Sequence, residues 1–223
     1  MSDTARYYAI VKYAKVGLLR YLGHLDVARA FDRAVRRAQI GVRYSEGFSP
    51  RARISFPLPL SVGAEGTQEL CGIELVEPAP AEQLFHALAP ELAKFQPAEV
   101  KVKRGTKRSP FAELTVACYD VVPNFDDELP AERLQRAVAE LMAEQEIVIQ
   151  RQTKRRVTTI NVRPYVYRLQ TGADTLSMCL GMTEETLVKP EEVLTGLANI
   201  IGVASTGWRR LIRTGMYSEA PEL

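Results

Sequence analysis

Apolar side chains in the first part of the chain follow two different periods. Residues 6–15 (RYYAIVKYAK) combine aromatic and β-branched side chains in a short run that is typical of a β-strand. Further along, apolar side chains recur at steps of three and four residues, the spacing of one face of an α-helix. These helical positions are Val27, Phe31, Ala34, Val35 and Ala38. The pattern predicts a strand followed by an amphipathic helix, which Gly41 is expected to end.

Strand and helix patterns continue to alternate through the rest of the first half. We expect an extended piece at 42–45, a loop at 46–51, a strand at 54–60 interrupted by prolines, a strand at 68–77, a helix at 81–94 and a strand at 97–104. With the extended piece set aside, the order of elements is βαββαβ. This order is typical of a four-stranded antiparallel sheet with both helices on one face.

The second half repeats this order without visible sequence identity to the first. We expect a strand at 111–122, a helix at 130–145, extended segments at 147–152 and 158–170, a strand at 175–182, a helix at 190–201 and a strand at 208–217. The fold class predicted is α+β, with two tandem ferredoxin-like (βαββαβ) domains over residues 1–106 and 107–223. A basic, turn-prone linker at 105–110 separates them.

Positive charge is clustered rather than spread along the chain. The net charge of the 223 residues is only +2. Basic residues concentrate at 20–53, at 99–108 and at 151–156, while acidic residues gather at 126–146 and 184–192. This separation favours a localised anion-binding face; the alternative for each cluster is an ordinary solvated surface.

Arginines on the first predicted helix lie opposite its apolar face. Arginine grips phosphate bidentately and stacks on bases, so this stripe predicts an anion-binding surface. Asp26 is spaced to pair with Arg29, and Asp32 with Arg36, but two carboxylates do not neutralise the whole set. The candidate nucleic-acid-binding residues here are Arg20, Arg29, Arg33, Arg36 and Arg37.

The segment after this helix, 44–53, adds hydroxyl, aromatic and basic side chains around Gly47 and Pro50. We expect its hydroxyls to bind phosphates or neighbouring amides. Phe48 either stacks on a base or folds back onto the core. The candidate binding residues in this segment are Tyr44, Ser45, Phe48, Arg51 and Arg53.

A second cationic and aromatic pattern lies at 155–168. If this stretch is one strand, Arg163, Tyr165 and Tyr167 share a face and form a stacking platform, with Arg163 and Tyr165 as binding candidates. The alternative is an ordinary exposed strand face. Three more arginines accompany the single tryptophan at 206–214.

Candidate catalytic chemistry is sparse. His24, two residues before Asp26, is the candidate general acid or base; a ligand contact and a structural role are the alternatives. The chain has no GxxxxGK[ST] or GxGxxG motif, which gives nucleotide hydrolysis and hydride transfer no support.

The cysteine and N-terminal patterns give expectations about cofactors and compartment. The three cysteines are far apart, so they do not form a zinc ribbon or an iron–sulfur nest. We therefore expect no metal or cofactor in this chain and three buried free thiols in a reducing compartment. There is no signal-peptide core and no membrane-spanning run, so a cytoplasmic location without membrane contact is expected.

Several long motifs resemble the radical-SAM-linked proteins, bacterial proteins built on a domain of unknown function. The matching stretches are LRYLGHLD (19–26), RAVRRA (33–38), YSEGFSP (44–50), RISFPLPL (53–60) and, more loosely, VRPY (162–165) and RLIRTG (210–215). The family lacks an established activity. The resemblance implies a partner, a radical SAM protein that supplies the iron–sulfur cluster absent here, and hints at RNA.

Three functional hypotheses follow. In the first, the chain is a non-catalytic RNA-binding or substrate-presenting partner of a radical SAM enzyme in RNA modification or processing. In the second, it is a metal-independent endoribonuclease that uses His24, because the tandem βαββαβ order is similar to that of CRISPR RNA-processing enzymes. In the third, it is a protein-interaction module that docks on the radical SAM protein without RNA. The first and third hypotheses give the chain no enzymatic activity of its own, and the alternative, if it is an enzyme, is an endoribonuclease.

Overall fold

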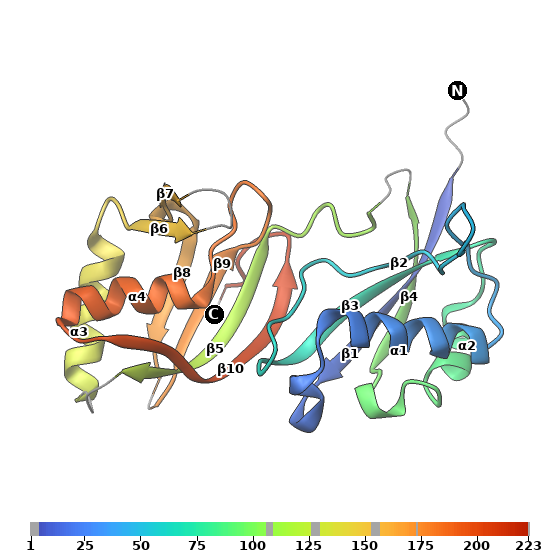
Figure 1. Cartoon of the computed structure of the whole chain (residues 1–223), viewed down its shortest axis with the longest axis horizontal. Helices are drawn as coiled ribbons and strands as arrows, with labels where there is room; N and C mark the ends of the chain where they lie inside the picture. The colour runs from blue at the N-terminus through green and yellow to red at the C-terminus, as the bar shows by residue number, and fades with distance from the viewer. Residues whose placement is uncertain (1–4, 106–108, 126–129, 153–156, 173, 223) are drawn as a thin grey trace. The chain divides into compact units, whose positions relative to one another are not determined.

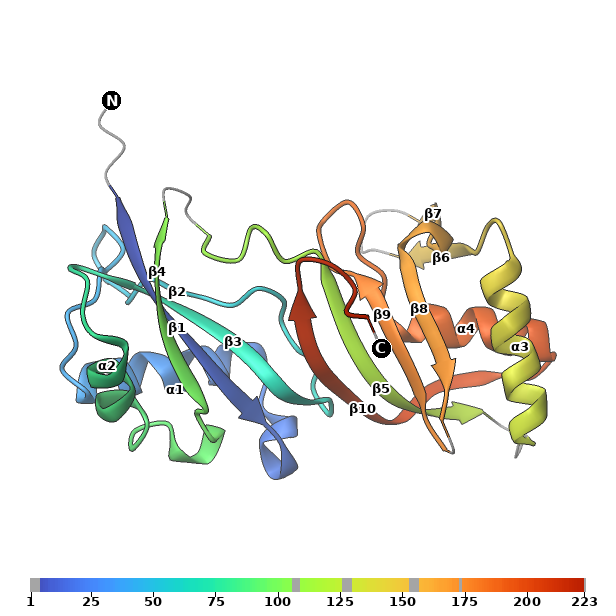
Figure 2. The ribbon, with the colours of Figure 1, turned by 180° about the vertical axis from the view of Figure 1, so that it is seen from behind.

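The computed structural model describes residues 5–105, 109–125, 130–152, 157–172 and 174–222. Over these ranges the protein is a mixed α+β fold with four α-helices and antiparallel sheets (Figures 1 and 2). It divides into two compact units, an N-terminal unit (1–113) and a C-terminal unit (114–223), and each is described by itself. No helix in the described ranges is both long and apolar enough to cross a membrane.

The N-terminal unit places two helices on one face of an antiparallel sheet. Its elements are β1 (Arg6–Lys15), η1 (Gly17–Tyr21), α1 (His24–Arg37), β2 (Ile54–Ser55), β3 (Glu65–Leu75), α2 (Ala81–Leu88), η2 (Ala93–Phe95) and β4 (Glu99–Gly105). The strand order is β4-β1-β3-β2, and all neighbouring strands are antiparallel.

The core of this unit confirms the helical pattern of the sequence. Val27, Phe31, Ala34 and Val35 of α1 are buried, and they share one cluster with Leu84 and Leu88 of α2 and with the inward-facing residues of β1 and β3. The aromatic ring of Phe31 lies 4.8 Å from that of Tyr13 and 5.5 Å from that of Phe95, measured between centroids. Alternation along the strands therefore sends one set of side chains toward the helices and the other to the opposite face of the sheet.

Several predicted boundaries in this unit are wrong, among them the end of the second helix, which the sequence placed at 94 and the structure places at Leu88. Helix α1 ends at Arg37, before Gly41, because Gln39 takes a left-handed conformation with φ of 54°. The predicted strand 54–60 is paired only over Ile54–Ser55, since proline at 57 and 59 lacks the N–H that a ladder requires.

The C-terminal unit has the same strand order with one inserted hairpin. Its elements are β5 (Val116–Phe125), α3 (Ala131–Ala143), β6 (Val148–Gln152), β7 (Val157–Asn161), η3 (Arg163–Tyr165), β8 (Val166–Thr171), β9 (Leu176–Gly181), α4 (Pro190–Ile201) and β10 (Ser205–Tyr217). The strand order is β10-β5-β9-β8, again antiparallel throughout, and β6 pairs with β7 as a separate ribbon. Helix α4 packs on β5 and β10, and α3 on β8.

The extended segment predicted at 158–170 is not continuous. Strand β7 ends at Asn161, the η3 turn occupies 163–165, and β8 begins at Val166. Pro164 lies in the first turn of η3, where a backbone N–H has no partner within the helix, so the N–H that proline lacks is not missed. The strand face proposed for Arg163, Tyr165 and Tyr167 is therefore wrong, because two of these residues lie in a turn.

The expectation of three free thiols is also wrong. Cys118 of β5 and Cys179 of β9 lie opposite each other in the ladder and form a disulfide, with Cα atoms 4.0 Å apart. Cys71 is a buried free thiol, and burial raises its pKa well above the usual value. The sequence separation of 61 residues gave no hint of the pairing, which depends on strand register.

Candidate nucleic-acid interface

The arginine stripe forms on α1 because the apolar positions of the helix face the sheet. Arg29, Arg33, Arg36 and Arg37 are all exposed on the opposite side. Asp26 lies in the first turn, where a carboxylate is favourable to the helix dipole. The sequence correctly predicted that this face of the helix is basic.

Most of these arginines have a carboxylate neighbour. Arg29 pairs with Asp26 at 3.4 Å and Arg36 with Asp32 at 3.0 Å, as the spacing predicted. Arg37 lies 3.6 Å from Glu91, beyond α2, which the sequence did not suggest. The hydrogen bond to Asp32 raises the pKa of Arg36.

These pairs leave the stripe with an excess of positive charge. The Arg33 side chain makes no ion pair or hydrogen bond within the described part of the chain. Exposed ion pairs contribute only about 0–1 kcal/mol, so a phosphate can displace the carboxylates at little cost. The stripe borders a groove of about 690 Å³, which Lys94 of η2 also lines.

The segment after α1 folds into a hairpin that we call the 43–53 hairpin. The backbone N–H of Ser45 donates to Arg51 O, and that of Arg53 donates to Arg43 O, each at 2.8 Å. The Ser45 hydroxyl accepts a hydrogen bond from the backbone N–H of Arg51, so it serves the loop itself. Gly47 at the tip has φ of +118°, a conformation that favours glycine.

Phe48 projects from the tip of this hairpin. Its relative exposure is 110%, which rules out packing on the core in this structure. Of the two alternatives the sequence left open, folding back onto the core is wrong, and base stacking by the exposed ring stays a prediction. Arg51 is also exposed in the same loop.

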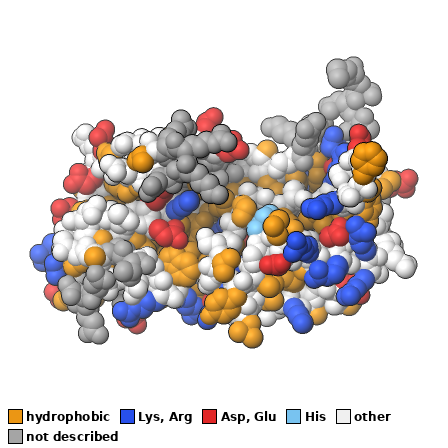
Figure 3. Space-filling view, in the orientation of Figure 1, with side chains coloured by type: hydrophobic (Ala, Val, Ile, Leu, Met, Phe, Trp, Pro, Cys, Tyr) orange, Lys and Arg blue, Asp and Glu red, His pale blue; other side chains and the backbone are white. Residues whose placement is uncertain are grey.

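Tyr44 joins the hairpin to the helix stripe. The Arg36 guanidinium lies over the Tyr44 ring, 5.7 Å from its centroid, within cation–π range. Figure 3 shows lysine and arginine side chains gathered over α1 in this unit. Arg36 thus links the helix arginines to Tyr44 of the hairpin, and we call the four helix arginines, Tyr44 and Phe48 at the hairpin tip the basic face.

At the start of the basic face, Arg20 is held by its neighbours. Its guanidinium donates to the Tyr21 hydroxyl at 2.9 Å, which raises the arginine pKa, and lies 3.8 Å from Glu65. His24 opens α1 and is exposed, and its ring meets Phe56 edge-on at 5.2 Å. The structure gives His24 no hydrogen-bonded partner among the described residues, so its catalytic role stays a prediction.

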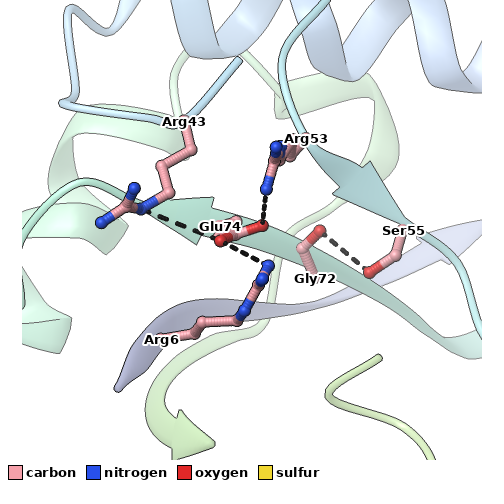
Figure 4. A network of polar contacts seen from close by, with 6 residues as sticks. All are labelled: Arg6, Arg43, Arg53, Ser55, Gly72 and Glu74. Atoms are coloured by element: carbon pink, nitrogen blue, oxygen red, sulfur yellow. Dashed lines mark hydrogen bonds and ion pairs between the residues drawn. The ribbon is translucent and has the colours of Figure 1, made fainter. Parts of the chain in front are cut away.

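Arg53 lies on the other face of the sheet. Its guanidinium, with those of Arg6 and Arg43, converges on the carboxylate of Glu74 (Figure 4). Residues next to it in sequence, such as Ile54, pack instead on the helix side of the sheet. The predicted binding residues therefore divide between two faces, which strand alternation separates.

The candidates in the C-terminal unit are used inside the fold. Arg163 donates to Val166 O at 3.2 Å and to Met142 O at 2.6 Å, so its guanidinium ties η3 to the end of α3. Tyr165, beside it in the same turn, is half-buried. Arg163 thus has an internal role that the sequence did not reveal.

Other basic residues of this unit are also engaged. Arg151 forms two hydrogen bonds to Glu192, at 2.5 and 2.7 Å, and these raise its pKa. Trp208 donates to Glu191 and Arg209 to Asn124. The predicted basic residues at 153–156, and Lys107 and Arg108 in the linker, lie outside the described residues.

Sequence reasoning missed Arg6, Arg43 and Glu74 as members of a site. Glu74 is the acidic residue inside an otherwise apolar run, LCGIELV (70–76), and a buried acid in that position needs a cation. That signal was present, but the identity of its partners depends on the folded arrangement of three separate segments.

The comparisons with known proteins place this chain in a family without a known function. Residues 9–190 match a family described as an uncharacterized protein conserved in bacteria (DUF2344), and the chain belongs to this family. No curated protein matches the sequence.

Among solved structures, the crystal structure of a Cbf5–Nop10–Gar1 complex matches with a TM-score of 0.51 and 12% sequence identity. The match covers 93% of this chain and 48% of that chain, so this protein spans about half its length. A Cas6 product complex matches at a TM-score of 0.24 and 14% identity, over 95% of this chain and 100% of that chain. The first match concerns the fold alone.

Proposed function

We propose that this protein is a non-catalytic RNA-binding or substrate-presenting subunit that works with a radical SAM enzyme in the cytoplasm. Single-stranded RNA lies along the basic face, with its phosphates on the α1 arginines. Both units are ferredoxin-like domains in this proposal, and the shared strand order 4-1-3-2, counted without β6 and β7, supports this.

The observation that carries the proposal is the continuity of arginines and exposed aromatics on the basic face. Arg36 over Tyr44 links the helix to the hairpin, and Phe48 stands free at the tip. Proteins that bind single strands combine a cationic track with aromatic rings that stack on successive bases. The basic face has both parts within one unit.

The radical SAM partner comes from the sequence resemblance. Support for a protein contact comes from three exposed apolar side chains beside the basic face: Leu18 at 85%, Tyr21 at 58% and Leu25 at 66% exposure. Such side chains clustered at one end of a basic surface are typical of an interaction site.

The test is the salt dependence of RNA binding. The affinity of the full chain for a fluorescent single-stranded RNA is measured by anisotropy between 50 and 200 mM salt, with log–log slopes of about −0.7 for each phosphate contacted. The variant Arg29→Gln/Arg33→Gln/Arg37→Gln is expected to lose at least about tenfold in affinity and to have a shallower slope. Arg104→Gln, exposed on β4, is the matched control.

Two outcomes would contradict the proposal. If the wild-type chain binds no RNA but retains a radical SAM protein after nuclease treatment, the chain is a protein-interaction module. If the RNA is cleaved and His24→Ala abolishes cleavage, the chain is an endoribonuclease.

A further inference from the structure

The second face of the N-terminal sheet holds a separate cluster of arginines. Arg6 begins β1, while Arg43 and Arg53 face each other across the stem of the 43–53 hairpin, so two segments that are distant in sequence contribute the three guanidiniums. Each of the three forms an ion pair with Glu74 of β3, Arg6 and Arg53 through a terminal nitrogen and Arg43 through Nε (Figure 4). We call these four residues the Glu74 cluster.

The backbone explains why the arginines meet there. The N–H of Arg43 donates to Glu74 O at 2.8 Å, and the N–H of Glu74 donates to Arg53 O at 3.0 Å. Alternation along these segments then directs the side chains of Arg43 and Arg53 to the face on which the Glu74 carboxylate lies. Arg6 reaches the same carboxylate from two residues before Tyr8, the register partner of Glu74.

One carboxylate does not use up the donors of three guanidiniums. The Glu74 side chain is 6% exposed and lies 3.1 Å from Arg6, 3.5 Å from Arg53 and 3.8 Å from Arg43. Only the first is a close hydrogen bond. Each guanidinium has several N–H donors, and the arginine side chains remain 30–44% exposed.

Of these three arginines, Arg6 and Arg53 border a cavity of about 590 Å³. Its lining includes Arg6, Arg53, Glu74 and Ser55, with Glu46 contributed by the hairpin. The charged residues of the lining, Arg6, Arg53, Glu46 and Glu74, sum to zero, and Arg43, which pairs with Glu74 from outside the lining, brings the total to +1. A buried carboxylate holds the arginines in place, while the excess charge and unused N–H groups are left for a ligand.

We propose that this cavity is a binding site for a phosphate monoester group, separate from the basic face. A phosphate monoester carries about −1.5 to −2 charges at pH 7 and three strong acceptor oxygens, which suits several arginines that approach from different directions. Arginine forms bidentate hydrogen bonds to phosphate. The group is either the terminal phosphate of an RNA strand or that of a free nucleotide, and both sources present the same chemistry.

The primary test uses inorganic phosphate and a nucleoside 5′-monophosphate as probes, titrated into the full chain by calorimetry. Arg6→Gln and Arg53→Gln are each expected to weaken binding at least about tenfold, the effect of one hydrogen bond to a charged group. Arg104→Gln is expected to change it less than about twofold, and Glu46→Gln to strengthen it. Arg6 lies outside the hairpin, so its variant tests the site without altering the loop.

The second arm identifies the source of the phosphate. Affinities are compared for one RNA sequence with a 5′-phosphate, a 3′-phosphate or hydroxyl ends. A preference for one phosphorylated end that Arg6→Gln removes assigns the site to RNA termini, and tight binding of the mononucleotide alone assigns it to a small molecule.

The proposal is overturned if neither probe nor phosphorylated RNA binds, or if Arg6→Gln and Arg53→Gln leave binding unchanged. It is also overturned if both variants weaken phosphorylated and hydroxyl-ended RNA equally, because the cluster then only anchors the hairpin. Phosphate binding by a chain that binds no hydroxyl-ended RNA contradicts the proposed function but supports this site.

Discussion

In the N-terminal unit most arginine side chains lie at the surface. In the C-terminal unit three arginines, Arg151, Arg163 and Arg213, direct their guanidiniums to acceptors within the fold or are buried. Residues 1–113 contain 17 lysines and arginines against 12 acidic residues, and residues 114–223 contain 12 against 15. The same strand order thus supports two uses of one residue type, and the acceptors within reach decide between them.

Breaking the Arg151–Glu192 pair should have the largest effect on stability. Glu192 is 8% exposed, so Arg151→Met leaves a buried carboxylate without its cation and lowers the free energy of unfolding by about 3–5 kcal/mol. Denaturant unfolding measures the loss. Arg136→Met, exposed on α3, is the control and should cost less than about 0.5 kcal/mol. Equal losses in the two variants would show that arginine has no special internal role in this unit.

Removing the Cys118–Cys179 disulfide should have the next largest effect. A bond across 61 residues restricts the unfolded chain, so Cys118→Ala/Cys179→Ala lowers the free energy of unfolding by about 2–4 kcal/mol. Oxidised wild-type protein with and without reductant is the comparison. The disulfide belongs to the C-terminal unit, whereas the N-terminal unit has the free thiol Cys71. Mass spectrometry that finds three free thiols in the untreated protein would contradict this difference.

Truncating Phe48 should affect binding and leave stability unchanged. Because the ring is fully exposed, Phe48→Ala should not change the melting temperature. The free energy of binding to single-stranded RNA should become less favourable by about 1–3 kcal/mol, since one stacking contact is lost. Val62→Ala, an exposed apolar residue of the same unit, is the matched variant. An unchanged RNA affinity for Phe48→Ala would take the hairpin tip out of the basic face.

The smallest effect is expected at alkaline pH. Burial, and then the charge of Glu74, raises the pKa of Tyr8 above the ordinary phenol value of about 10. A raised pKa in the folded state gives stability that is fully present below pH 10 and is lost as the pH rises through the folded pKa. Unfolding at pH 9 and pH 11 should show a smaller alkaline loss for Tyr8→Phe than for wild type. Tyr167→Phe is the control, and an identical loss in all three proteins would contradict the expectation.

The sequence predicted those features that depend on local periodicity. The spacing of Val27, Phe31 and Val35 correctly placed the buried face of α1, and the spacing of Asp26 and Asp32 correctly gave two ion pairs. Both are properties of a single helix and need no knowledge of the rest of the chain.

Features that depend on register between distant segments could not be read from the sequence. Glu91 reaches Arg37 from another element, and Cys118 meets Cys179 only because β5 and β9 pair in one register. Arg53 is separated from the α1 arginines because side chains alternate between the two faces along this edge of the sheet. The paired strand there, β2, has two residues, whereas the sequence predicted a strand over 54–60. Local chemistry was visible in advance, but the face on which each group appears was not.

The way Glu74 fastens the 43–53 hairpin has a practical consequence. Its main chain and its side chain both secure the stem of the hairpin at Arg43 and Arg53, while residues 46–50 are exposed beyond the last backbone bond. Because the sheet is bonded to the stem and not to the tip, we expect foreign sequences of equal length to be accepted at 46–50 without loss of the sheet. The hairpin offers a natural position for a fluorescent reporter or an exchanged recognition loop on this scaffold.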